Sequence, residues 1–173
     1  AEVNINSTLR HWRMEKRATA ELSGQYLATP ANFLEPIRLH LESDFRPIEL
    51  VSVYRLQTLR RNASNTTGTP TNYALVQGEF EFFPSPDATY NVEMTYYASV
   101  APLSDSNTQN VILQNFPDLY LYGSLSHSAP YLADDARLPV WSSLYASGIE
   151  TANKQSGEGK YGGSGLRMKI RSY

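Results

Sequence analysis

Apolar residues near the N-terminus recur with the spacing of an amphipathic helix. Ile5, Leu9 and Trp12 stand at intervals of four and three positions, so they fall on one face of a helix. This pattern predicts a helix over residues 1–16. No convincing capping residue precedes it, and we therefore expect a further helical segment ahead of Ala1.

The second half of the chain repeats this helical spacing. One helix is predicted over residues 117–132, with Leu121 and Leu125 on its apolar side. A last helix is predicted from residue 134 or 135 to about residue 156, with Gly157 as its C-terminal cap. The apolar stripe of this last helix comprises Leu138, Trp141, Tyr145 and Ile149.

Between these ends the pattern changes to strands, in which apolar and polar residues alternate with a period of two. The clearest example is the stretch 90–96. Turn-forming pairs at residues 23–24 and 77–78 predict two hairpins, over residues 18–28 and 72–83. The remaining expected elements are strands over residues 36–42 and 46–50 and a short helix from Ser52 to residue 61.

Together these elements predict an α+β protein. Helices from both chain ends are expected to form a helical bundle, with a small antiparallel β domain inserted into it and an extended C-terminal tail. The expected boundaries are 1–16 for the first bundle helix, 17–100 for the β domain, 101–156 for the C-terminal bundle helices and 157–173 for a flexible docking tail. The expected bundle core comprises Leu9, Trp12, Leu121, Leu125, Leu138, Trp141, Tyr145 and Ile149.

The tail is rich in glycine and carries too little apolar surface to order itself. Its last part alternates apolar with basic side chains, so an extended conformation gives it one apolar edge and one basic edge. This pattern is typical of a segment that adds to the sheet edge of a partner. The expected docking residues are Leu166, Arg167, Met168, Lys169, Ile170 and Arg171.

Composition narrows the possible functions. The chain has 173 residues, of which 41% are hydrophobic, enough for a domain with a core of its own. A net charge of −2 argues against a general nucleic-acid-binding protein. The absence of cysteine excludes disulfides and zinc–thiolate sites. Neither a membrane-spanning stretch nor a signal-peptide pattern is found.

Several residues have the chemistry of catalytic or binding groups but lack the required context. Gly157, Gly159 and Gly162 match a dinucleotide-binding spacing, but they follow a predicted helix instead of opening one. The three histidines are scattered along the chain without metal-ligand spacing. We therefore expect no cofactor and no metal.

Two groupings are compatible with catalysis only at first sight. Ser126, His127 and a nearby aspartate supply the residue types of a hydrolytic triad, but neighbours on one helix point in different directions. Glu79 and Glu81 could form a carboxylate pair, although any solvent-facing strand shows the same spacing. We expect no catalytic residue and no enzymatic activity.

Two blocks in the C-terminal half are the most specific part of the sequence. Residues 117–125 read PDLYLYGSL and residues 134–141 read DDARLPVW. Together with residues 14–20 and 26–34, they resemble the adaptor, or head–tail connector, proteins of tailed bacteriophages. The resemblance covers most of residues 10–165. Pro139, inside the last predicted helix, departs from the family pattern.

This resemblance implies a structural protein of the virion neck, made in the cytoplasm of a bacterial host. It implies a ring of about twelve copies below the portal protein, through which DNA passes without sequence-specific contacts. The implied partners are the portal, neighbouring adaptor copies and a nozzle, stopper or tail protein, with no membrane. Leu166–Arg171 would dock on the portal or on the next copy. A β-rich module that binds sugar in a tail or baseplate is the alternative, because the chain has twelve tyrosines.

Overall fold

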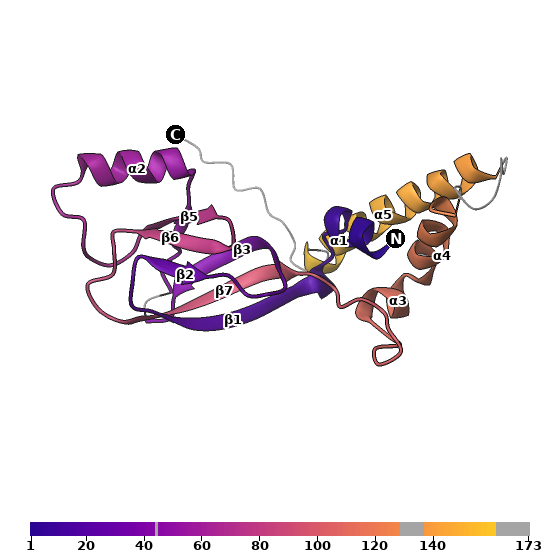
Figure 1. Ribbon diagram of the computed structural model, residues 1–173, viewed down its shortest axis with the longest axis horizontal. Coiled ribbons are helices and arrows are strands. Elements are labelled where there is room, and N and C mark those ends of the chain that lie inside the picture. Colours follow the sequence, from indigo (N-terminus) through magenta and orange to yellow (C-terminus); the bar gives the residue numbers. More distant parts are fainter. Residues whose placement is uncertain (44, 129–136, 162–173) are drawn as a thin grey trace, which may run out of the picture. The chain divides into compact units, whose positions relative to one another are not determined.

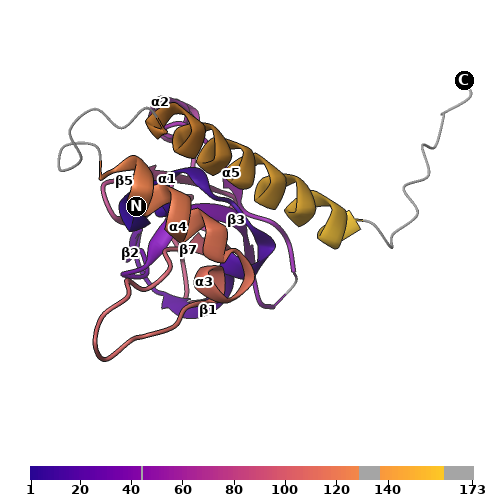
Figure 2. The same cartoon turned by 90° about the vertical axis from the view of Figure 1, so that its right-hand side faces the viewer.

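The computed structural model describes residues 1–43, 45–128 and 137–161. The chain divides into two compact units, whose elements are labelled in Figures 1 and 2. One unit comprises Ala1–Met14 and the chain from Ser99 onward, and we call it the helical unit. The other comprises Glu15–Ala98, and we call it the β unit.

The β unit contains two sheets. In the three-stranded sheet, β7 (Tyr90–Ala98) lies between β1 (Glu15–Leu22) and β3 (Phe33–Leu41) and is antiparallel to both. The four-stranded sheet has the order β2 (Tyr26–Ala28), β6 (Glu79–Phe83), β5 (Asn72–Val76) and β4 (Glu49–Leu50).

The core of the β unit is formed by side chains from both sheets. Alternation along β7 buries Val92, Met94 and Tyr96 and leaves the residues between them more exposed. From the other sheet, Phe80 and Phe82 are fully buried. Aromatic rings meet edge to face within this core, the arrangement that the negative face and positive edge of each ring favour. The ring centroids of Tyr73 and Phe80 are 5.6 Å apart.

Helix α2 (Val53–Asn62) packs on the four-stranded sheet. Its Leu56 contacts Ala74 and Phe83 in a second, smaller cluster. The helix begins where the sequence predicts, because the hydroxyl of Ser52 accepts a hydrogen bond from the Arg55 N–H at 3.2 Å. The expected hairpin over residues 72–83 and the strand over 90–96 are confirmed as β5–β6 and β7.

The helical unit contains a 3₁₀ turn at Trp12–Met14 and four helices among the described residues. Helix α4 (Pro117–Ser126) packs beside α5 (Leu138–Tyr161), as both views show (Figures 1 and 2). The two can approach closely because a Cβ at Gly148 would lie only 2.8 Å from Cδ2 of Leu119. The other two helices are α1 (Glu2–Thr8) and α3 (Val111–Asn115).

The expected helical bundle built from both chain ends is wrong. The chain is 38% helical and 30% strand, with seven strands in two sheets and five helices in its described part. The first helix stops at Thr8 because the backbone of Leu9 is extended, and the chain then enters β1. The β region is also not purely antiparallel, since β4 and β5 pair in parallel.

Two further local predictions fail. The expected hairpin over residues 18–28 does not form, because β1 pairs with β7 and β2 pairs with β6, in different sheets. Gly157 does not cap the last helix, because α5 continues to Tyr161. Gly159, within this last part of α5, allows a close approach to Trp12, since a Cβ there would lie 3.1 Å from Nε1 of Trp12.

Candidate assembly surfaces

The N-terminal segment is fastened to α5 by hydrogen bonds between side chains and backbone. The Arg10 N–H donates to Oδ1 of Asn153 at 2.9 Å, and the Trp12 N–H donates to Oγ of Ser156 at 2.8 Å. The two acceptors are three residues apart and therefore lie on one face of α5. They satisfy backbone groups that α1 no longer pairs after it ends at Thr8.

Helix α1 also holds the chain where it enters the helical unit for the second time. The carboxamide of Asn6 bonds both backbone groups of Val100: it accepts from the N–H at 2.9 Å and donates to the carbonyl at 3.3 Å. The carboxylate of Glu2 accepts from the Leu103 N–H at 2.7 Å. These hydrogen bonds fix the connection to α1.

An open groove of about 360 Å³ runs between α4 and α5. Phe116, Leu119 and Leu144 line it together with polar residues. Apolar side chains also face solvent on these two helices, with Leu121 54% and Val140 56% exposed. An apolar surface of this kind is typical of a site that contacts another protein.

The predicted core residues occupy different environments in the single chain. Leu9 is fully buried, whereas Trp12 is 40% and Leu121 54% exposed. That the eight predicted core residues pack in a common core stays a prediction. The half-buried members of the set are Leu125, Leu138, Trp141, Tyr145 and Ile149. The predicted docking residues Leu166, Arg167, Met168, Lys169, Ile170 and Arg171 lie outside the described residues.

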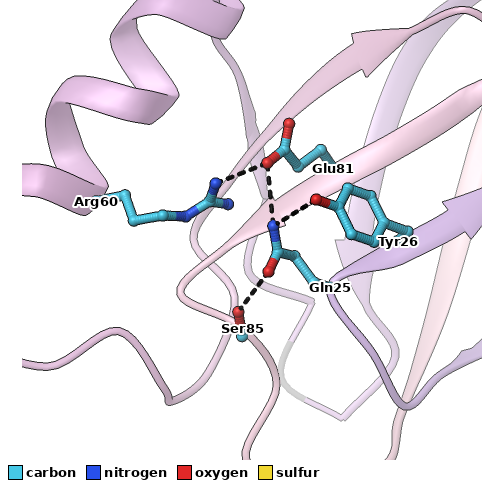
Figure 3. A network of polar contacts seen from close by, with 5 residues as sticks. All are labelled: Gln25, Tyr26, Arg60, Glu81 and Ser85. Atoms are coloured by element: carbon cyan, nitrogen blue, oxygen red, sulfur yellow. Dashed lines mark hydrogen bonds and ion pairs between the residues drawn. The ribbon is translucent and has the colours of Figure 1, made fainter.

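A polar network in the β unit joins α2 to the four-stranded sheet (Figure 3). At its centre the buried Glu81 carboxylate accepts hydrogen bonds from Nη1 of Arg60 at 2.8 Å and from Nε2 of Gln25 at 3.0 Å. The Gln25 side chain also contacts the hydroxyls of Tyr26 and Ser85. This network positions the helix on the sheet.

The sequence pattern did not reveal this network. Glu79 is exposed as expected, but Glu81 is buried among its own strand's aromatic residues. The available signal was Arg60, a cation near the end of a predicted helix, but nothing local shows which carboxylate it contacts.

A family model described as SU10 adaptor protein matches residues 1–168. The chain belongs to the SU10 adaptor protein family. The resemblance inferred from the sequence is thereby confirmed. No match was found among curated proteins.

Family membership makes this chain a structural adaptor of a bacteriophage and a component of the virion. It implies interaction with other head and tail proteins and a non-enzymatic role. Helices long and apolar enough to cross a membrane are absent from the described part of the adaptor.

Two of the residues weighed as catalytic candidates, Ser126 and His127, lie at the C-terminal end of α4. Ser126 donates its hydroxyl to the Tyr122 carbonyl of its own helix at 2.6 Å, and His127 is exposed at the helix end. Within residues 1–43, 45–128 and 137–161, no three His, Asp or Glu side chains gather as a metal site would require. Burial raises the pKa of Tyr73 in the core of the β unit.

Proposed function

We propose that this adaptor assembles into a ring that joins the portal protein to the tail or nozzle of the virion. The observation that carries the proposal is the family match over residues 1–168. A closed ring of about twelve copies requires each copy to present two different complementary surfaces. The two units of the chain offer separate surfaces for such contacts.

The α4–α5 surface supports a subunit or portal contact. Its groove, which Leu144 lines, and the neighbouring Leu121 and Val140 expose apolar area that the single chain leaves uncovered. Removing apolar surface from water contributes about 25 cal/mol for each Å², which favours covering this surface in an assembly. We infer that this surface packs against the portal or the next adaptor copy.

The proposed ring lines the DNA exit path. The net charge of −2 supports passage of DNA without tight binding, because phosphate contacts by many basic residues would hold the duplex. We expect the adaptor to bind free DNA weakly and without sequence preference.

The surface is tested by placing a charge in it. Leu144→Asp puts a carboxylate on the apolar surface of α5, and we expect at least a tenfold loss of ring formation or portal binding, measured by native mass spectrometry and by pull-down with purified portal. Ser143→Asp is the matched control, because this exposed neighbour lies outside the groove lining. Equal ring formation and portal binding by the two variants would contradict the role of this surface.

The C-terminal segment is tested by deletion. Because α5 continues to Tyr161, the deletion should start at residue 162 and leave the helix whole. We expect the shortened adaptor to keep its helical content by circular dichroism and to lose either portal binding or ring formation. Undiminished portal binding and ring formation would show that Leu166–Arg171 dock on neither partner. An image of the intact neck by cryo-electron microscopy gives the copy number and partners directly.

A further inference from the structure

The hydrophobic core of the β unit is open along one seam. An apolar cleft of about 160 Å³ lies at β1 and β2, which are edge strands of their respective sheets. Small residues at its rim, Ala18, Ala20 and Ala28, leave the gap unfilled. Four buried core residues also line it: Leu39, Phe80, Val92 and Met94.

Beside this cleft, strand β1 is an edge strand of its sheet. In the described part of the chain it pairs along one side only, with β7, over Glu15–Leu22. The N–H and C=O groups of its other side can therefore pair with an added strand.

The two faces of this edge differ in chemistry. Pairing with β7 places Ala18 and Ala20 on the core side, opposite Met94 and Val92. Thr19 and Glu21 alternate onto the outer side. There a polar hollow of about 390 Å³ is lined by Glu21, Glu42 and Asn91 together with Thr19 and Ala20 at the strand edge, and its charged residues are both acidic. The basic Arg17 on this side is paired with Glu93 at 3.1 Å.

We propose that residues 166–171 of a neighbouring adaptor copy add to β1 as an extra strand. Leu166, Met168 and Ile170 would face the core side, and the basic residues between them would face the acidic outer side. An apolar cavity of about 150 Å³ accommodates a benzene-sized group, so the cleft has room for one of these side chains. The inference rests on the proposed ring, which places copies side by side.

The other sheet edges fit this strand less well. Strand β3 has register shifts at Phe33/Glu35 and Pro36/Arg38 and contains a proline, which lacks a donor. It is also bridged from His40 to Pro47. Strands β2 and β4 are only three and two residues long. Strand β1 is the long, regular edge that borders an open apolar cleft.

Cysteine cross-linking tests the docking directly, because the chain has no cysteine of its own. One full-length adaptor carries Ala20→Cys and a second, with a different tag, carries Leu166→Cys, Met168→Cys or Ile170→Cys in separate experiments. Facing residues on paired strands approach the Cβ separation of about 3.5–4.5 Å that a disulfide needs. We expect a disulfide between the two tagged copies for at least one of these pairs, under mild oxidation.

Two controls define the background. Ile37→Cys is exposed on the opposite edge of the same sheet, and Lys169→Cys is expected to point to the opposite face of the docked segment. We expect at least fivefold less cross-link when Ile37→Cys replaces Ala20→Cys as the partner of the apolar segment positions. We expect the same decrease when Lys169→Cys replaces those positions as the partner of Ala20→Cys.

The outcomes separate this inference from the proposed function. Cross-linking of all three apolar positions to Ala20→Cys at the Ile37→Cys level overturns the docking, whether or not rings form. A further sample carries both cysteines in one chain. If a disulfide forms only within that chain, and never between the two tagged copies, the choice of a neighbouring copy is overturned. Ring formation is measured on the same samples by sedimentation, so its failure is read independently of the cross-link.

Discussion

The β unit and the helical unit are stabilised in different ways. In the β unit, Phe80 and Phe82 are fully buried in a core shared by two sheets. In the helical unit the two tryptophans, Trp12 and Trp141, remain partly exposed. There Asn153, Ser156 and other polar side chains tie separate segments together through backbone hydrogen bonds. Both units expose apolar side chains, such as Leu50 of β4 and Val140 of α5, but among the described residues the helical unit buries fewer apolar side chains than the β unit.

We therefore predict that the proposed assembly stabilises the helical unit more than the β unit. A partner that binds only the folded state raises its stability in proportion to RT ln(1 + [L]/Kd). The two units can be followed separately, because Trp12 and Trp141 both belong to the helical unit and report on it by fluorescence.

The largest effect is expected from the core of the β unit. Phe82→Ala should lower the free energy of unfolding by roughly 3–5 kcal/mol, because a fully buried ring leaves a cavity. Urea unfolding followed by circular dichroism measures it. Tyr54→Ala is the control, since this side chain is 80% exposed. If Phe82→Ala shifted the urea transition of tryptophan fluorescence as much as that of circular dichroism, the two units would unfold together. Their separate stabilisation would then be wrong.

A smaller effect is expected from the buried polar network. Glu81→Gln leaves the Arg60 guanidinium without its carboxylate and should destabilise the β unit by roughly 1–3 kcal/mol. The lower part of that range is favoured because the Arg60 side chain is 30% exposed and water compensates in part. Glu79→Gln, on the same strand but exposed, should change stability by less than about 0.5 kcal/mol in the same urea titration. Equal effects of the two substitutions would count against the network.

Each hydrogen bond between a side chain and the backbone in the helical unit should contribute about 1 kcal/mol to the free energy of unfolding. Asn153→Ala removes the acceptor of the Arg10 N–H and should lower the urea midpoint of the tryptophan fluorescence. Lys154→Ala changes an exposed neighbour on the same helix and should leave it unchanged. If Asn153→Ala also has no effect, the hydrogen bond to Arg10 does not stabilise the helical unit.

The smallest effect is expected for the change in folding stability at alkaline pH that the buried tyrosines cause. Burial raises the pKa of Tyr73 in the β unit, and of Tyr120 and Tyr145 in the helical unit. The folded state therefore keeps these protons longer than the unfolded state, so stability falls as pH rises above about 10. Tyr73→Phe should flatten this fall for the β unit, measured by urea midpoints between about pH 8 and 11. A slope as steep as that of the unchanged protein would exclude Tyr73 as a cause.

Elements with local signals were predictable from the sequence. Ser52 caps α2 and Asn110 caps α3, whose N–H groups at Ile112 and Leu113 donate to its side chain. The turn between β5 and β6 forms because Gln77 and Gly78 adopt the positive φ angles of 35° and 87° that a tight hairpin requires. Each signal lies within a few residues of the element that it specifies.

Long-range pairings were not predictable in this way. Strand β1 finds its partner β7 across most of the β unit, with Ala18 opposite Met94, and no local pattern identifies that partner. The burial of Glu81 depends on Arg60 from a helix that packs on the sheet. The family, in contrast, was predictable because residues 117–125 and 134–141 preserve a recognisable order of motifs.

The first and last strands of the β unit are direct neighbours, with Glu15 opposite Tyr97. The chain thus leaves the helical unit and returns to it through two adjacent strand ends, and Asn6 holds Val100 just after the return. Domain insertions are tolerated where the two connection points lie close together. A β unit of different sequence whose first and last strands pair in the same way could therefore replace this one while both connections to the helices stay in place.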